Sequence, residues 1–467
     1  MSQPVTFRRR AVGEMGTRKP AAVGRAARRF MGKRQWAVDD FTPMEETRDR
    51  ARMIRLHTLA NLHTYLDQFA DSVERNGGQV LWAADAAEAN RLISEVVGRK
   101  EGSLVIKSKS MVTEELDLNA HLQAEGHTVV ETDLGEFIVQ LAEDHPSHII
   151  APVMHLTRQD IGELFHKRLE IPYTDDPEEL NAVARRHLRR FFLSADVGIS
   201  GVNTGVAETG SIITVTNEGN GWLTTAAPRT HIAVMGMERL VPTFADAATI
   251  VEVLARSATG QRLSVYTNVV SGPRRPGDPD GPDEFVVVIV DNGRSRVLST
   301  DASEILACIR CGACLNVCPV FREVGGHAYG QVYSGPVGSV LAPGLAGFTD
   351  AVDLPFASSL CGACREVCPV RIDIPKLLVH QRVRATREND PFRWLGPGLS
   401  LYAQAAKRPR VWKSLLAAGR MAGRLKGKGE WFHRLPFHAK GWTQSRDFPA
   451  PARESFRQWW KENRDGS

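Results

Sequence analysis

The sequence predicts an α/β domain built on a parallel sheet, followed by a smaller domain organised around cysteine residues. Two features of the 467-residue chain predict this architecture. Short apolar runs alternate with amphipathic stretches from about residue 80 onward, which is typical of strands and helices that alternate along a parallel sheet. All seven cysteines lie between residues 308 and 368. The chain is long enough for about two or three domains with a sizeable core.

The N-terminal residues are strongly basic. Residues 1–34 contain ten Lys and Arg residues and one acid, so residues 1–44 are predicted to form a basic, loosely structured lead-in. Apolar residues then recur at spacings of three and four, which predicts one helix that ends at Gly77 and Gly78. This apolar stripe consists of Leu59, Leu62, Leu66, Phe69 and Val73.

Residues 45–300 are predicted to form the α/β domain. In its first half, apolar strands are predicted at residues 80–82, 104–106, 128–131 and 148–151. Helices are predicted at residues 86–97, from Thr113, at 137–141 and after Asp176 and Pro177. The second half is richer in glycine, with further buried strands predicted at residues 212–215, 232–235 and 285–290 and a surface loop at 271–283.

The cysteines follow a spacing that is typical of iron–sulfur proteins. Cys308, Cys311, Cys314 and Cys318 are separated by two, two and three residues, and Pro319 follows the last of them. This is the complete bacterial ferredoxin run. A second run repeats the pattern without its first cysteine and consists of Cys361, Cys364 and Cys368, with Pro369 after it. Residues 301–392 are therefore predicted to form a ferredoxin-type domain that binds two [4Fe–4S] clusters.

In this pattern the fourth cysteine of each run binds the cluster of the other run. The first cluster is thus predicted to be bound by Cys308, Cys311, Cys314 and Cys368. The second is predicted to be bound by Cys318, Cys361 and Cys364, with a fourth ligand that is not a cysteine. Ser358 stands where the pattern expects that cysteine. Ser358, another oxygen or nitrogen group, a three-iron cluster, or a small molecule or partner on the open iron all remain open.

Disulfides and zinc are the alternative uses of these cysteines. Disulfides are not expected, because seven is an odd number and the sequence shows no secretory signal. Zinc sites usually pair two short cysteine hairpins and lack three evenly spaced cysteines with a fourth before proline. Cluster-binding thiolates need a reducing compartment, so the expected location is cytoplasmic. No apolar run approaches the ~20 residues that cross a bilayer, so membrane contact is expected only at the surface.

Charge is distributed unevenly along the chain. The net charge is +5 overall, +9 for residues 1–34 and +11 for residues 393–467, which leaves −15 for the residues between them. Residues 393–467 are predicted to form a basic, tryptophan-rich C-terminal domain. Basic ends on an acidic body favour contacts with an acidic partner or an anionic membrane surface, although solvated basic helices would show the same pattern. Nucleic-acid binding is not expected, because no recognisable reading motif is present.

The chain resembles the lactate utilisation protein B family, the iron–sulfur subunits of bacterial L-lactate utilisation systems. The resemblance rests on residues 107–115, on residues 207–211 and on the two cysteine runs in this order. It implies an N-terminal domain similar in fold to ribose-5-phosphate isomerase and coenzyme A transferases, followed by an α-helical two-cluster ferredoxin domain. It also implies electron transfer during oxidation of L-lactate to pyruvate, with companion lactate-utilisation subunits and a downstream electron acceptor. In the family the cysteines are shared between the clusters as given above, without an eighth cysteine.

Two other interpretations compete with electron transfer from L-lactate. Glu208, which lies between glycines, is a candidate base or nucleophile for an enzyme, with Lys107 and Lys109 as candidate binders of a carboxylate or phosphate. A turn-stabilising glutamate and solvated lysines are the structural alternatives. The chain could also serve another 2-hydroxy acid, such as glycolate. The sequence contains no dinucleotide-binding glycine motif after a strand, so the hydride or proton chemistry is expected on a partner.

Overall fold

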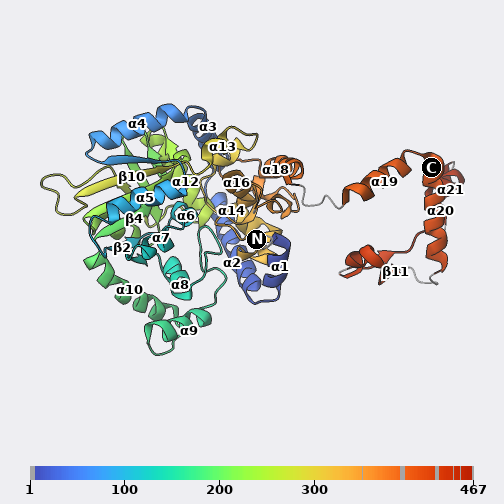
Figure 1. The fold of residues 1–467 in the computed structure, drawn as a ribbon, viewed down its shortest axis with the longest axis horizontal. Coiled ribbons are helices and arrows are strands. Elements are labelled where there is room, and N and C mark those ends of the chain that lie inside the picture. The colour runs from blue at the N-terminus through green and yellow to red at the C-terminus, as the bar shows by residue number, and fades with distance from the viewer. Residues whose placement is uncertain are drawn as a thin grey trace. The chain divides into compact units, whose positions relative to one another are not determined.

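The computed structural model describes residues 6–349, 351–389, 395–425, 431–444, 446–452 and 454–464 (Figure 1). The chain divides into two compact units, residues 1–391 and 392–467. Each unit is described by itself. Among the described residues, none of the helices is both long and apolar enough to span a bilayer.

The first unit is built on a six-stranded sheet in which every pair of neighbouring strands is parallel. In spatial order its strands are β1 (Gln79–Ala83), β10 (Glu284–Val290), β7 (Thr230–Gly236), β4 (Val197–Gly201), β2 (Leu104–Lys107) and β3 (Thr128–Glu131). These strands are rich in Val and Ile because both faces of a parallel sheet are covered. The predicted parallel α/β fold is confirmed.

Separate apolar cores cover the two faces of this sheet. On one face, Ile93 of α5 (Ala86–Val97) packs with Val105 and Val288. On the other, Phe69 of α4 (Leu62–Arg75) packs with Val287 and with a second, four-stranded sheet. That sheet consists of β8 (Leu240–Val241), β5 (Thr204–Val206), β6 (Ser211–Thr216) and β9 (Tyr266–Val270).

Helices connect and cover the strands of both sheets. They are α3 (Met44–Ala60), α6 (Met111–Glu115), α7 (Leu118–Ala124), α8 (Leu134–Ala142), α9 (Arg158–Leu169), α10 (Pro177–Ser194), α11 (Asn220–Ala226), the 3-10 helix η1 (Met237–Arg239), α12 (Phe244–Ala258) and α13 (Arg294–Leu298). Asp176 caps α10 with Pro177 in its first turn, as predicted. The predicted helix through the apolar stripe is wrong in one respect. Asn61 separates α3 from α4, and its side-chain amide donates to the carbonyl of His57 at 2.9 Å.

The cysteine segment is helical in its described residues. Its elements are η2 (Ser303–Ala307), α14 (Ala313–Val317), α15 (Pro319–Val324), η3 (His327–Tyr329), α16 (Gly335–Ala346), η4 (Leu354–Phe356), α17 (Ala363–Glu366) and α18 (Ile374–Asn389). It shares its apolar core with α12 and the N-terminal helices, and it belongs to the same compact unit as the sheet.

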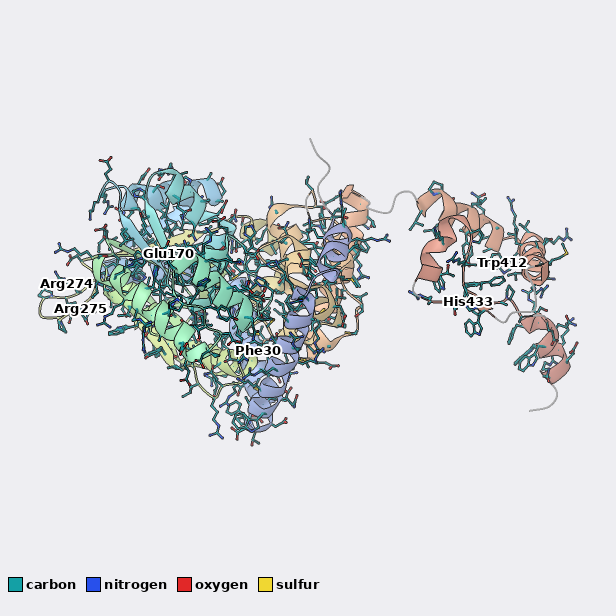
Figure 2. All side chains as sticks on the ribbon, turned by 90° about the horizontal axis from the view of Figure 1, so that it is seen from below. Phe30, Glu170, Arg274, Arg275, Trp412 and His433 are labelled. Carbon is teal, nitrogen blue, oxygen red and sulfur yellow. The ribbon has the colours of Figure 1, made fainter. Side chains whose placement is uncertain are left out.

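The prediction of a loosely structured lead-in is wrong for most of residues 1–44. Residues Phe7–Met15 form α1 and residues Lys19–Asp39 form α2, which Figure 1 shows beside α14. Val23 and Ala27 of α2 are buried, and Val23 belongs to the apolar core of the cysteine segment. Phe30, which is labelled in Figure 2, stacks on His148. Small apolar residues at helical spacing supply this packing face, and the dense positive charge of the segment conceals it in the sequence.

Residues 148–151 do not form the predicted strand. The imidazole Nδ1 of His148 accepts hydrogen bonds from the backbone N–H groups of Ile150 (3.0 Å) and Ala151 (3.2 Å). Side-chain bonds of this kind satisfy the backbone in place of a strand ladder. The segment is a buried loop that lies against the first cysteine run, where a Cβ atom on Gly312 would be 3.0 Å from His148 Cε1.

The second unit is a small group of helices with one short strand pair. It contains α19 (Gly396–Ala406), α20 (Pro409–Leu425), β11 (Trp431–Phe432), η6 (Phe437–Gln444), β12 (Phe448–Pro449) and α21 (Phe456–Asn463). None of the side chains described in this unit is buried, and Trp431, Trp442, Trp459 and Trp460 are each about half exposed.

Candidate metal centre

The first cysteine run contains two left-handed backbone positions. Arg310 has φ 59° and Gly312 has φ 73°, so the chain turns sharply between Cys308 and Cys314. This turn directs the backbone N–H of Arg310 to Cys308 Sγ at 3.3 Å. Such N–H···S bonds stabilise thiolate charge and tune the potentials of iron–sulfur clusters. Cys318 then ends α14 and begins α15.

Four thiols gather beside this run, and one of them comes from the second run. Burial, together with the nearby Cys308 and Cys368 sulfurs, raises the pKa of the Cys311 thiol to about 12. Burial, followed by the Cys308 sulfur, raises the pKa of Cys368 to about 11. Burial, followed by the sulfurs of Cys308, Cys311, Cys364 and Cys368, raises the pKa of Cys314 well above its usual value, so Cys314 also lies near Cys364 of the second run. The structure therefore brings together Cys308, Cys311, Cys314 and Cys368.

The other three thiols form a second group. Burial, together with the Cys318 and Cys361 sulfurs, raises the pKa of the Cys364 thiol to about 12. Burial also raises the pKa of Cys318, and Cys361 adds to the effect. Cys318 thus lies with the second run, as Cys368 lies with the first. Cys361 is exposed, and it is the one cysteine of the seven that is.

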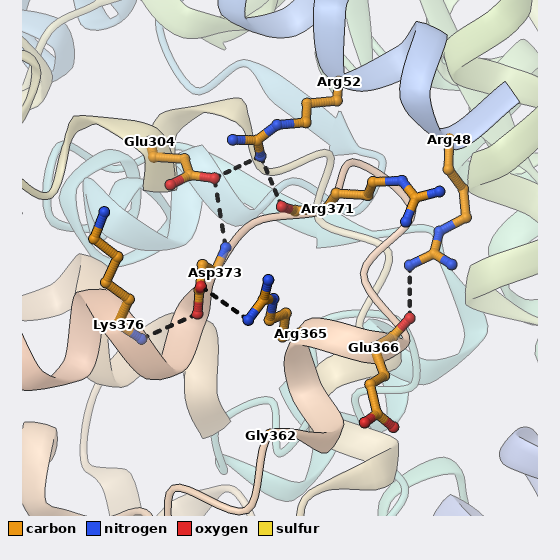
Figure 3. A pocket seen from close by; sticks show the side chains of 9 residues that line it. All are labelled: Arg48, Arg52, Glu304, Gly362, Arg365, Glu366, Arg371, Asp373 and Lys376. Carbon is orange, nitrogen blue, oxygen red and sulfur yellow. Dashed lines mark hydrogen bonds and ion pairs between the residues drawn. The ribbon is translucent and has the colours of Figure 1, made fainter. Parts of the chain in front are cut away.

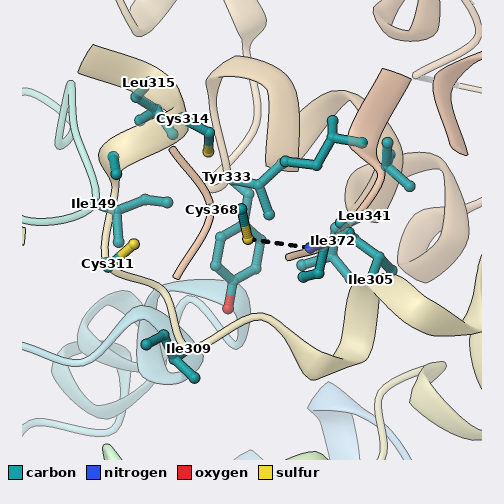
Figure 4. Close-up of a cluster of buried hydrophobic side chains, with 14 of the residues drawn as sticks. Ile149, Ile305, Ile309, Cys311, Cys314, Leu315, Tyr333, Leu341, Cys368 and Ile372 are labelled. Atoms are coloured by element: carbon teal, nitrogen blue, oxygen red, sulfur yellow. Dashed lines mark hydrogen bonds between the residues drawn. The ribbon is translucent and has the colours of Figure 1, made fainter. Parts of the chain in front are cut away.

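These two groups fit metal–sulfur clusters. Packed thiols with raised pKa values remain protonated on their own, whereas a bound metal deprotonates a coordinating thiol outright. Figure 4 shows Cys311, Cys314 and Cys368 among Ile149, Ile372 and other apolar side chains that exclude water. The backbone N–H of Ile372 donates to Cys368 Sγ at 3.3 Å.

Helices α2 and α3 hold the backbone of the second run. Arg48 of α3 is buried and donates from Nη2 to the carbonyls of Cys368 (2.8 Å) and Glu366 (2.6 Å). Arg34 of α2 donates to the carbonyl of Val367 at 3.0 Å. These arginines place positive charge around the first thiol group.

Ser358 is half-buried, and its hydroxyl oxygen accepts a hydrogen bond from the backbone N–H of Leu360 at 3.1 Å. Its carbonyl accepts from Arg382 at 2.9 Å. Leu360 and Gly362 both have positive φ values, so the chain turns tightly just before and just after Cys361. The hydroxyl group of Ser358 is therefore hydrogen-bonded within its own loop.

A buried charge network, which the sequence did not predict, joins the first cysteine run to the sheet. Glu238 follows β7 and is fully buried, and it accepts from Arg294 Nε at 2.7 Å and from Arg310 Nη2 at 3.3 Å. Burial raises the pKa of Glu238, but the surrounding guanidinium groups, led by Arg294, lower it to about 2. Glu238 is therefore ionised at neutral pH.

Arg294 extends this network to α6. It donates from Nη2 to Glu115 Oε1 at 2.7 Å, and Glu115 also accepts from the Tyr333 hydroxyl. The guanidinium of Arg310 lies 4.7 Å from the centre of the Tyr333 ring. Arg310 lies between Cys308 and Cys311, and this position was the one signal in the sequence that pointed to it.

The two lysines of the sequence prediction have different environments. Lys107 is fully buried at the end of β2 and pairs with Glu131 (2.8 Å) and Glu114 (3.0 Å), so its charge is internal to the fold. Lys109 lies 3.3 Å from Glu136 and lines a cavity of about 320 Å³. Only Lys109 is therefore in a position to contact a ligand in that cavity.

Glu208 lies elsewhere. It is exposed in the turn between β5 and β6, where its carboxylate accepts from the backbone N–H of Phe244 at 3.3 Å. It is not among the described residues that line the cavity. This environment favours the structural role of a turn-stabilising glutamate.

A charged groove opens beside the second cysteine run (Figure 3). Gly362, which directly follows the exposed Cys361, is one of its lining residues. Its cations are Arg48, Arg52, Arg365, Arg371 and Lys376, and its acids are Glu304, Glu366 and Asp373. The groove is therefore positively charged on balance.

Seven cysteines in two runs, joined to a parallel α/β domain, define an iron–sulfur protein. The LUD domain family matches residues 66–290, the 4Fe-4S dicluster domain family matches residues 304–372, and the C-terminal domain family of lactate utilisation protein B matches residues 398–465. The chain belongs to the lactate utilisation protein B family.

Full-length relatives support this assignment. Lactate utilization protein B of Bacillus licheniformis is 47% identical over 456 residues, covering 95% of this chain and 93% of the relative. The protein of the same name from Bacillus subtilis is 46% identical, covering 94% and 92%. An uncharacterized electron transport protein, YkgF of Escherichia coli, is 46% identical, covering 95% and 93%.

Proposed function

We propose that this protein relays electrons through two [4Fe–4S] clusters during the oxidation of L-lactate to pyruvate. The observation that supports it most directly is the exchange of Cys318 and Cys368 between the two thiol groups, which is the ligand arrangement of two-cluster ferredoxins. The names of the relatives supply the substrate. Oxidation of one lactate releases two electrons and two protons, and such clusters accept electrons singly.

In this proposal Cys308, Cys311, Cys314 and Cys368 bind the first cluster. Cys318, Cys361 and Cys364 bind the second, whose fourth ligand is not a cysteine. Backbone N–H groups of Arg310 and Ile372 stabilise thiolate charge at the first cluster. Apolar side chains around it exclude water. Arg34, Arg48 and Arg310 add positive charge there, which favours the reduced state.

Three further parts of the proposal come from the family resemblance. The α/β domain shares the fold of ribose-5-phosphate isomerase and coenzyme A transferases, and the cysteine domain is an α-helical ferredoxin. The partners are the companion lactate-utilisation subunits, which carry the hydride or proton chemistry, and a downstream electron acceptor. The reducing environment that free thiols require supports a cytoplasmic location.

The cluster content tests the proposal directly. Protein purified without oxygen is expected to be brown and to contain about seven to eight irons per chain with a matching amount of acid-labile sulfide. Metal analysis and visible absorption measure this. Reconstitution with the companion subunits should then give cluster reduction with L-lactate, with D-lactate and glycolate as comparison substrates. Colourless protein that contains zinc in place of iron would contradict the assignment.

We further propose that an acidic partner docks on the charged groove next to Cys361. An exposed ligand cysteine beside the groove keeps the distance for electron transfer short. The Arg365→Glu/Lys376→Glu double variant is expected to slow electron transfer to the downstream electron acceptor by about tenfold or more at low salt, because steering by opposite charge is lost. Stopped-flow reoxidation of the reduced protein at increasing salt measures this effect.

A matched variant controls for the change in net charge. Arg158→Glu/Lys167→Glu makes the same change on α9, where both side chains are more than half exposed. It is expected to leave the rate within about twofold of the wild type. Equal slowing by the two double variants would show that net charge matters and that the groove does not.

A further inference from the structure

We propose that the cavity of about 320 Å³ between the sheet and the first cysteine run binds the carboxylate of a small 2-hydroxy or 2-oxo acid, an inference that rests on the proposed function. Nothing in the names of the relatives or the matched domains assigns this site. Its volume falls in the range of small-molecule sites.

The cavity lies where an open parallel sheet offers a binding crevice. Neighbouring strands β2 and β4 mark a reversal of strand order, because the chain continues from β2 outward to β3, and from β4 in the opposite direction to β7. Ligands bind outside the carboxyl ends of the strands at such a point. The cavity is lined there by Ser108–Met111, directly after β2, and by Gly201–Asn203, which begin with the last residue of β4.

Two buried arginines line this cavity and retain donors for a ligand. Arg310 is 5% exposed and Arg239 is 7% exposed. Arg310 Nη2 binds Glu238 and Arg239 Nη1 donates to the carbonyl of Cys308 at 3.2 Å. Within the described part of the chain, Arg310 Nε and Nη1 and Arg239 Nε form no hydrogen bond, and Arg239 Nε lies 3.8 Å from Glu238 Oε1. Guanidinium donors match the geometry of a carboxylate, and leaving them unpaired when buried is costly.

The charges around these arginines favour an anion. Three guanidinium groups, those of Arg239, Arg294 and Arg310, share two carboxylates, those of Glu115 and Glu238. Three positive charges against two negative charges leave one positive charge, which these guanidinium groups place between the Cys308 loop and the cavity. Lys109, which also lines the cavity, lies 3.3 Å from Glu136 in an ion pair, and its Nζ forms no hydrogen bond among the described residues.

The opposite flank of the cavity orients the ligand. Asp133, which follows β3, and Glu218 lie on the other side of the β2–β4 boundary from Arg239. Glu218 accepts from the N–H of Leu134 at 3.2 Å, and burial, followed by the Asp133 charge, raises its pKa to about 7. In their ionised form these carboxyl groups repel a second anionic group and accept a hydrogen bond from a hydroxyl group, and Glu218 in its protonated form can donate one to an oxo group. A molecule with one carboxylate and one neutral oxygen substituent fits both flanks.

Binding to iron-loaded full-length protein tests the site. Isothermal titration calorimetry without oxygen is expected to detect L-lactate and pyruvate, with lactamide and inorganic phosphate at least tenfold weaker. Arg239→Gln is expected to weaken pyruvate binding about tenfold or more, because a charge-assisted hydrogen bond to the ligand is lost. Arg239→Lys should recover part of the affinity. Lys100→Gln, which removes a surface cation paired with Asp196, should leave binding unchanged.

A second readout depends on the first cluster and not on catalysis. A bound anion near Arg310, whose N–H contacts Cys308 Sγ, should shift the reduction potential of one cluster to a more negative value. Redox titration followed by electron paramagnetic resonance detects this shift.

If Arg239→Gln fails to fold, Ala258→Met reduces the cavity without a change of charge and should also weaken binding.

The outcomes separate this inference from the proposed function. Iron-replete wild-type protein that binds neither acid, or Arg239→Gln and Ala258→Met variants that bind pyruvate as well as the wild type, would overturn the cavity site and leave the clusters standing. Phosphate binding as tight as pyruvate binding would overturn the carboxylate assignment. Protein without iron would instead contradict the proposed function.

Discussion

Replacing Cys368 with alanine is expected to remove about four irons per chain and the resonance signal of one cluster, while the other cluster stays. Cys368 stands in the second cysteine run, but its thiol lies beside Cys308 and Cys311. Iron analysis and electron paramagnetic resonance of the reduced protein measure the loss. Cys364→Ala, four residues earlier, should remove the other signal and a similar amount of iron, because that thiol lies with Cys318 and Cys361.

Double variants determine how the cysteines are shared. Cys314→Ala/Cys368→Ala affects a single thiol group, so it should lose no more iron than Cys368→Ala alone. Cys364→Ala/Cys368→Ala affects both groups and should lose nearly all of it. Cys364→Ala/Cys368→Ala, whose two cysteines belong to the same run, could instead lose only about four irons while Cys314→Ala/Cys368→Ala loses nearly all of them. That result would mean that each run binds its own cluster and that the exchange is wrong.

Much of the α/β fold could be predicted because its strands are short, continuous apolar runs. The predicted strands at residues 232–235 and 285–290 lie inside β7 and β10, which are central in the sheet and buried on both faces. Residues 148–151 have the same apolar character and form a loop. Their backbone is satisfied by His148 and their burial comes from the cysteine run, which is far away in the sequence.

The sequence predicted the part of the candidate site whose residues follow a local pattern. Cysteine spacing is a local pattern, and it identified the seven thiols. Glu238, Arg239 and Arg294 have no local pattern, because their partners are contributed by separate elements of the fold. Glu208 drew attention through its glycine neighbours, yet Gly205 pairs with Ile212 in the β5–β6 hairpin and Gly210 lies in its turn. Gly210, with φ 65°, leaves no room for a Cβ beside the backbone of Ser72 and Val73.

Replacing Arg294 with leucine is expected to lower the free energy of unfolding by about 3–5 kcal/mol, because two buried carboxylates lose their shared partner. Arg294 is fully buried and binds both Glu115 and Glu238 at 2.7 Å. The urea concentration at the midpoint of unfolding, followed by circular dichroism, measures the change. Arg91→Leu is the control, since its pair with Glu95 is more than half exposed on α5 and should contribute less than about 1 kcal/mol.

The same variant tests whether the network couples the sheet to the cysteine segment. Glu115 ends α6, Glu238 follows β7 and Arg310 lies within the first cysteine run, so Arg294 is the link between parts that are distant in sequence. In the wild type, loss of cluster absorbance and loss of helical signal should therefore occur at the same urea concentration. In Arg294→Leu the cluster absorbance should be lost first, because the cysteine run is no longer held to the sheet through Glu238. Coincident transitions in the variant, or a midpoint equal to that of Arg91→Leu, would show that apolar packing alone joins the two parts.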